Sequence, residues 1–154
     1  MIRTSPPLLP GRPALPEGIP SWPEAVERLG AAQAVSRSPG PFAVATPLPG
    51  DRAFLAVDRF AGETLCWRSD AQQLHWATRA DDLGSTEIDV QALYDYLFFH
   101  VIPSPRTIFK GVNRLPAGHY GLWNGKQMEV GSYGRLNFQP QKAPSFDRLK
   151  AEFA

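Results

Sequence analysis

Two stretches of the sequence, YLFFHVIPSPRTIFKGV at residues 96–112 and LPAGHY at 115–120, mark the change from helix to β structure. In front of them, Asp89 is a good N-cap. Apolar side chains then recur at the three- and four-residue spacing of an amphipathic helix, at Leu93, Tyr94, Leu97, Phe98 and Val101. The two prolines of the first stretch end that helix, because proline lacks an amide donor and restricts the residue before it. The sequence therefore predicts a helix over residues 90–101.

A β-hairpin is predicted directly after these stretches. The run 108–110 leads into a second β region, with strands expected over 119–124 and 127–133 and Asn124-Gly125 between them. Asn-Gly between alternating apolar residues is the strongest short-range hairpin signal, because a type I′ turn needs positive φ at both central positions.

Four short β-like runs precede the helix, over residues 42–46, 53–59, 64–68 and 73–78. Turn residues such as Pro49-Gly50-Asp51 separate them, which is typical of an antiparallel meander. Along residues 53–57 both alternating faces are apolar, so this strand is expected to be central and covered on both sides.

Proline dominates the start of the chain, and residues 1–20 are predicted to form an extended arm, because each proline fixes φ and removes a donor. A polyproline ligand for an SH3-like partner stays open as an alternative, since Pro7 and Pro10 form a PxxP. Ser21, with Glu24 three residues on, is a capping box that opens a short helix over 23–33.

Length, charge and composition exclude several classes of protein. The chain has 154 residues, which is one domain's length, with 16 Lys and Arg against 15 Asp and Glu and no basic block. A nucleic-acid or anionic-membrane partner therefore has no electrostatic support. No run reaches the ~18 apolar residues of a membrane span, and no signal peptide opens the chain. The single cysteine permits no intrachain disulfide, so we expect a cytoplasmic protein.

A search for reactive groups predicts no catalytic, cofactor-binding or metal-binding residue. Cys66 lies in an apolar run with no His nearby and is expected to be a packed thiol. The histidines at 75, 100 and 119 lack metal-ligand spacing, and Asp81-Asp82 is expected to lie in a solvated turn. No glycine-rich phosphate loop is present.

Three segments, in order and at fitting intervals, resemble the N-terminal glutamine amidotransferase (class II, Ntn-type) domain of the asparagine synthetase family. FLAVDRF at 54–60 with TLCW at 64–67 is similar to the family's strand pair LxxARDRxGxKPLYY. LHWATRADDL at 74–83 stands in the place of LxFASExKAL. The two opening stretches match YLxxxxxPxPxTIFxGIxxLPPGHY almost position for position, and the resemblance covers roughly residues 40–135.

The working residues of that family are not matched. In intact members a Cys directly after the initiator Met is the nucleophile, and Ile2 stands at that position. The family's Gly-Asp, whose carboxylate holds the substrate amine, corresponds to Gly40-Pro41. Its DRxG glycine is replaced in Asp58-Arg59-Phe60-Ala61, and its Tyr-Trp at the domain junction becomes Tyr133-Gly134.

The first half of the family's domain also has no room here. That half supplies an Arg that clamps the glutamine carboxylate and an Asn-Gly pair that forms the oxyanion hole. Residues 1–38 are too short and too rich in proline to contain it, and the Asn-Gly of this sequence falls in the late hairpin. Without nucleophile or oxyanion donors, the resemblance implies no glutamine hydrolysis.

The resemblance implies an α+β fold, a truncated Ntn-type layered arrangement with antiparallel sheets and flanking helices. One sheet edge is expected to be left unpaired, and to be closed by dimerisation or by the arm. The expected division is a proline-rich arm at 1–20, a partial glutamine amidotransferase-like domain at 21–136, and a linker at 137–154 with the start of a helix at 145–153 toward a missing synthetase domain.

The matching residues are expected to have structural roles. Asp58 and Arg59 are interpreted as a buried pair at a strand end, and residues 103–111 as a rigid crossover from helix to hairpin. The full set of such positions is Asp58, Arg59, Pro103, Pro105, Thr107, Phe109, Gly111, Leu115, Pro116, Gly118, His119 and Tyr120.

For function, the resemblance implies a catalytically silent amidotransferase-like domain with a structural or regulatory role beside an ATP-dependent, amide-forming synthetase domain or subunit. No cofactor is expected in this chain, because ATP and Mg²⁺ belong to that missing domain. Two alternatives stay open: a stand-alone protein-binding or scaffold module, and an active enzyme that uses Cys66 or another residue that the sequence does not identify. A homodimer also stays open, and neither a nucleic acid nor a membrane is expected as a partner.

Overall fold

The computed structural model describes residues 15–70, 73–134 and 145–152. Among these residues the helices are α1 (Trp22–Leu29), α2 (Ala31–Ser36), α3 (Val90–Phe99) and α4 (Phe146–Glu152), with a short 3₁₀ turn, η1 (Asp81–Leu83). The strands are β1 (Ala43–Leu48), β2 (Arg52–Val57), β3 (Cys66–Asp70), β4 (Gln73–Ala77), β5 (Asn113–Arg114), β6 (His119–Trp123) and β7 (Met128–Ser132). The predicted α+β class is confirmed.

The strands form two antiparallel sheets, ordered β1-β2-β6-β7 and β4-β3-β5. The predicted central position of residues 53–57 is confirmed: β2 lies between β1 and β6, and its side chains from Ala53 to Val57 are fully buried. The predicted single meander is wrong, because β2 pairs with β6 and the chain crosses to the second sheet before β3. Both sheets are open, so each described sheet has unpaired edges.

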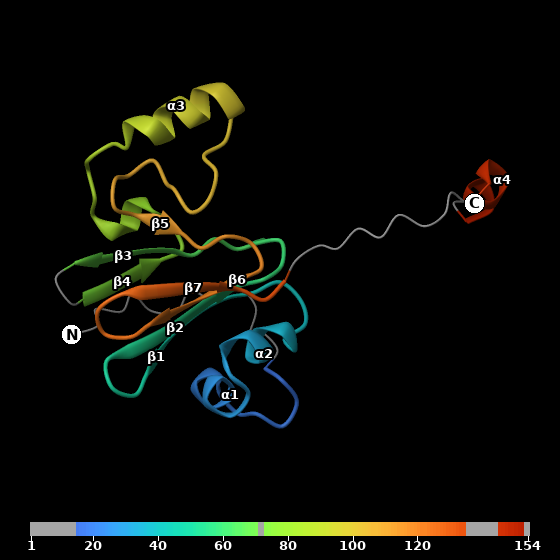
Figure 1. The fold of residues 1–154 in the computed structure, drawn as a ribbon, viewed down its shortest axis with the longest axis horizontal. Helices are drawn as coiled ribbons and strands as arrows, with labels where there is room; N and C mark the ends of the chain where they lie inside the picture. The colour runs from blue at the N-terminus through green and yellow to red at the C-terminus, as the bar shows by residue number, and fades with distance from the viewer. Residues whose placement is uncertain (1–14, 71–72, 135–144, 153–154) are drawn as a thin grey trace.

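The sheets pack face to face, and helices cover one outer side (Figure 1). Between the sheets lies a core that joins β2 and β6 to β3, β4 and the segment before β6, with Leu55, Leu74, Trp76, Leu115 and Trp123 at its centre. On the opposite face of the first sheet, α1 and α2 pack over Phe42, Val44 and Phe54. A smaller cluster on the second sheet joins Cys66 to Leu83 and Val112.

The N-terminal helix region is divided in two, which corrects the predicted helix over 23–33. Ser21 caps α1 as expected, with its hydroxyl accepting from Glu24 N at 3.4 Å. Gly30 has φ +78°, outside helical space, so α1 ends there and α2 begins. Of the predicted arm, residues 1–14 lie outside the described residues, as does the PxxP. The described part is a turn rather than an extended segment, with Ile19 N donating to Pro16 O at 3.1 Å.

The hairpin β6-β7 is confirmed, but its turn differs from the prediction. Trp123 pairs with Met128, so the loop has four residues, and Asn124 does not adopt positive φ. Instead, Asn124 Oδ1 accepts from the amides of Lys126 and Gln127, both at 3.0 Å. Asparagine therefore closes this turn through its side chain rather than through left-handed backbone.

Helix α3 begins and ends as the sequence indicates, within two residues. Asp89 Oδ1 accepts from Gln91 N and Ala92 N, and the helix stops at His100, which has φ +58°. The buried residues of α3 are Ala92 and Asp95, so the apolar side expected from the spacing of Leu93 and Leu97 faces solvent.

None of the described helices combines the length and apolarity needed to cross a bilayer. The linker at 137–144 lies outside the described residues, and the predicted helix start at 145 is confirmed by α4.

Candidate functional site

A cavity of about 500 Å³ lies where the end of β2, the end of α2 and the loop before β1 meet. Its lining includes Gly40-Pro41, Asp58, Arg59 and Tyr133, all of which the resemblance singled out. These residues are far apart in the sequence and are brought together by the pairing of β1 with β2 and of β6 with β7. This Asp58 cavity is therefore the candidate functional site.

Asp58 is buried, and its carboxylate is surrounded by backbone donors. Oδ1 accepts from Phe60 N at 2.8 Å, and Oδ2 accepts from Phe42 N and Gly62 N at 3.2 Å each. Its main chain is tied as well, since Gly118 N donates to Asp58 O at 2.9 Å. Bonds of backbone amides to an ionised carboxylate are stronger than neutral ones. Asp58 therefore joins the start of β1, the turn after β2 and the loop before β6.

Arg59 does not pair with Asp58, so the predicted buried pair is wrong. Arg59 is exposed, and none of the ion pairs among the described residues includes it. Its stem passes the backbone of Gly134, where an added Cβ would lie 3.2 Å from Arg59 Cγ. The glycine at 134 thus leaves room for Arg59. With Arg37, which also lines the cavity, Arg59 gives the Asp58 cavity a positive rim.

The hydroxyl groups of the cavity are also engaged in the fold. Ser36 Oγ donates to Gln33 O at 3.1 Å, and Ser38 Oγ donates to Ala34 O at 3.0 Å, so both close the end of α2. Tyr133 OH donates to Val57 O at 2.7 Å. Burial raises the pKa of the Tyr133 hydroxyl to about 12; the Asp58 carboxylate adds to this rise and Arg59 opposes it. Tyr133 is therefore a neutral donor at physiological pH.

Gly118 and its neighbours connect the cavity to the hairpin. Gly118 O accepts from Tyr133 N at 3.0 Å, and Gly118 has φ +67°. Leu115 is buried between the sheets, and Pro116 O accepts from His119 N at 3.2 Å. The His119 ring lies 2.7 Å from Ala117 O through Nδ1, and because a carbonyl oxygen only accepts, Nδ1 is the donor of this bond. Tyr120 packs against the cluster under α1 and α2.

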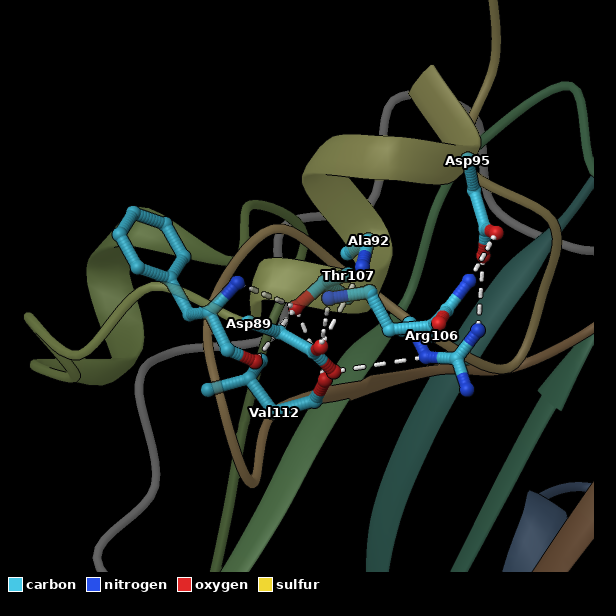
Figure 2. A network of polar contacts seen from close by, with 8 residues as sticks. Asp89, Ala92, Asp95, Arg106, Thr107 and Val112 are labelled. Atoms are coloured by element: carbon cyan, nitrogen blue, oxygen red, sulfur yellow. Dashed lines mark hydrogen bonds and ion pairs between the residues drawn. The ribbon is translucent and has the colours of Figure 1, made fainter. Parts of the chain in front are cut away.

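The crossover from α3 to the hairpin forms a second, separate polar network (Figure 2). Thr107 is buried; its Oγ1 lies 2.8 Å from Val112 O and accepts from Phe109 N at 3.2 Å. Arg106 binds Asp95 at 2.7 Å and Asp89 at 3.4 Å, which anchors the inner side of α3. Of the other motif positions, Phe109 packs on the Cys66 cluster, Pro105 O accepts from Arg114 N, and Pro103 and Gly111 are exposed.

Cys66 lies outside the Asp58 cavity, in β3. Its side chain is buried beside Leu83 and Val112 and lines a smaller hollow of about 310 Å³ with Arg114. Burial raises the pKa of the Cys66 thiol to about 11; Arg114 opposes the rise and Asp81 adds to it. The predicted packed thiol is confirmed, and such a thiol is a poor nucleophile because the thiolate is the reactive form.

We expect alkylation of Cys66 at about pH 8 to be at least about 100-fold slower in the folded chain than in the denatured chain. Burial blocks access to the thiol, and its pKa of about 11 leaves little of the reactive thiolate. The measurement is mass-spectrometric counting of carbamidomethyl groups after iodoacetamide, with and without guanidinium chloride. Equal rates in the two states would contradict the packed assignment and favour a reactive thiol.

The remaining sequence candidates are dispersed. Asp81 forms an ion pair with Arg79 at 2.6 Å in an exposed turn, as expected for Asp81-Asp82. His75 lies 3.2 Å from Asp70, far from the Asp58 cavity in the second sheet. Across residues 15–70, 73–134 and 145–152, no group of three or more His, Cys, Asp or Glu side chains is arranged to hold a metal ion.

Sequence reasoning found Asp58 and missed its partners, which are main-chain amides. The part that Tyr133 takes in the cavity does not follow from the sequence, which marks only its place before Gly134. In comparison with known proteins, residues 23–134 match the model of a family described as "Glutamine amidotransferase domain", and no curated protein matches the sequence. The matched region runs from α1 to the end of β7 and includes the whole Asp58 cavity and the α3 crossover.

Proposed function

The chain belongs to the glutamine amidotransferase domain family, and from this premise we propose that it is a catalytically silent member. In this proposal it is an Ntn-type domain of an asparagine-synthetase-related protein. Its role is structural or regulatory, beside a domain or subunit that forms amides at the expense of ATP. The amine for that reaction then comes from a source other than glutamine hydrolysed in this domain.

One observation carries the proposal: the carboxylate and the hydroxyl groups of the Asp58 cavity are bound by the fold itself. The Asp58 carboxylate has three backbone donors, and the hydroxyls of Ser36, Ser38 and Tyr133 each donate to a carbonyl. Acyl transfer from glutamine needs an activated nucleophile and donors aimed at an oxyanion. The cysteine of this sequence is buried in the other sheet with a raised pKa.

The proposal assigns the nucleotide chemistry to the partner. ATP and Mg²⁺ are placed on the synthetase domain or subunit, and no cofactor is placed on this chain. The sequence has 16 Lys and Arg against 15 Asp and Glu, so neither a nucleic acid nor a membrane is proposed as a partner. A cytoplasmic location is part of the proposal and fits a single unpaired thiol.

A glutaminase assay on the full chain tests the proposed lack of glutamine hydrolysis. We expect no glutamate from L-glutamine above the buffer blank, because the cavity presents its hydroxyls and carboxylate to backbone partners. Cys66→Ala is the matched control. Glutamate release by the wild type that the Cys66→Ala variant loses would overturn the proposal and establish an enzyme that uses Cys66.

The proposed partner is tested separately by reading the coding DNA after Ala154 and in the neighbouring genes. We expect a synthetase with an SGG-containing pyrophosphate loop, either in frame or next to this gene. Finding no such coding sequence would overturn the synthetase partner while leaving the glutaminase result unaffected.

The alternative function is a stand-alone protein-binding or scaffold module. The observation that favours it is the exposed apolar side of α3, which the rest of the described chain leaves uncovered. If neither the coding DNA after Ala154 nor the neighbouring genes encode a synthetase, this alternative is favoured. A synthetase encoded in frame with this chain would exclude it.

A further inference from the structure

Several apolar side chains of α3 are exposed. Six side chains are here called the α3 apolar face: five on α3, Val90, Leu93, Tyr94, Leu97 and Phe98, and one two residues beyond its end, Val101. Their exposed fractions run from 43% to 76%. Val90, Leu93 and Leu97 follow the i, i+3, i+7 spacing with which helices normally bury a seam against another helix. Figure 1 shows α3 at the top of the molecule, beyond the second sheet. The buried residues of α3 are Ala92 and Asp95, so these apolar side chains are left to solvent.

The α3 apolar face is held in place from behind. Asp89 caps the helix, and Arg106 binds both Asp89 and Asp95 on the inner side (Figure 2). On the face itself, the rings of Tyr94 and Phe98 stack at 6.3 Å. A surface fixed in this way loses little conformational entropy when a partner covers it.

The size of the face fits a pair of identical chains. With aromatic side chains of roughly 150–250 Å² each and aliphatic ones somewhat smaller, these exposed fractions correspond to about 600 Å² per chain. Two copies would together bury about 1,200 Å², the lower limit of specific protein interfaces. A patch of this size lies at the upper end of what a typical monomer exposes, about 300–600 Å², and such patches are often functional.

The charges around the face also fit a second copy. The charged residue of α3 is Asp95, which is buried and paired with Arg106. At the neighbouring edge, Glu87 and Lys110 neutralise each other at 2.6 Å. In a twofold interface each surface meets its own copy, so a charged patch would repel itself, whereas a neutral apolar one does not. Antiparallel α3 helices would in addition place opposite ends of their dipoles together.

From these observations we propose that the chain forms a homodimer about a twofold axis, with the α3 apolar faces of two copies packed against each other. This inference does not rest on the proposed function. It replaces pairing at a sheet edge, the mode of dimerisation expected from the sequence, by pairing of helices.

Size-exclusion chromatography with light scattering on the full chain, from about 1 to about 200 μM, tests the dimer. We expect the mass to rise from 17.0 kDa to twice that value with concentration. Leu97→Glu places a charge in the centre of the face and is expected to weaken the dimer at least about 30-fold, the range of an interface hot spot. Tyr94→Lys is a second variant with the same expectation.

Val130→Glu is the matched control. Val130 is 47% exposed on β7, away from α3, so this variant receives the same charge and should dimerise as the wild type does. Circular dichroism on each variant verifies folding. A wild type that stays monomeric at the highest concentration overturns the proposal, whether or not another protein covers the face. The proposal is also overturned if Leu97→Glu and Tyr94→Lys both fold and dimerise as strongly as the wild type.

Discussion

Asp58→Ala is expected to lower the free energy of unfolding by about 3–5 kcal/mol, the largest effect of any single substitution considered. The carboxylate accepts from three amides, Phe42 N, Phe60 N and Gly62 N. Alanine would leave donors unpaired at a site where Asp58 is 5% exposed, and each buried unpaired group costs about 1–3 kcal/mol. Guanidinium denaturation followed by tryptophan fluorescence measures the change, since the sequence has four Trp.

Two variants keep this experiment interpretable. Asp58→Asn retains an acceptor oxygen and is expected to fold with about half the loss, which protects against an alanine variant that does not fold. Asp82→Ala removes an exposed carboxylate from the turn at η1 and should change stability by less than about 0.5 kcal/mol. A loss below about 1 kcal/mol for folded Asp58→Ala would contradict the assignment of Asp58 as the junction of β1, β2 and the loop before β6.

Gly118→Ala is expected to lower the free energy of unfolding by about 2–4 kcal/mol. Gly118 has φ +67°, where an L-residue costs about 1–2 kcal/mol. An added Cβ would also lie 2.6 Å from Gly134 O, and that contact is with backbone that cannot rotate away. Relief of the clash has to separate Gly118 from the segment that holds Tyr133, whose amide donates to Gly118 O.

Gly111→Ala is the control matched in backbone conformation. Gly111 has φ +75° and no atom within 4 Å of an added Cβ, so it should show the strain without the clash, about 1 kcal/mol. Denaturation curves for the two variants give the difference directly. If both substitutions lower the free energy of unfolding by the same amount, the close approach of residue 118 to residue 134 does not contribute to stability.

The candidate site was predictable in part, and Asp58 shows where prediction from sequence ends. Its burial at the end of a strand follows from the apolar run before it, because such a run indicates a covered strand. Its partners do not follow, because backbone amides are present at every residue and carry no sequence signal. Arg59 was the adjacent opposite charge, yet in the fold the turn amides already fill the space around the Asp58 carboxylate.

The sequence by itself determined the local structure of this protein. Asp89 opened α3, Ser21 opened α1, and the residues around Asn124 made the hairpin, because caps and turn residues act within a few positions of the chain. Helix α3 ends at His100, before the prolines that the sequence offered as its end.

Tertiary structure alone decided that β2 pairs with β6 rather than β3, and that α3 turns its apolar side to solvent. Pairing partners depend on contacts between segments more than 60 residues apart, as between Ala56 and Tyr120. The spacing of apolar residues defines a face of a helix, but it contains no information on whether this chain or another covers that face.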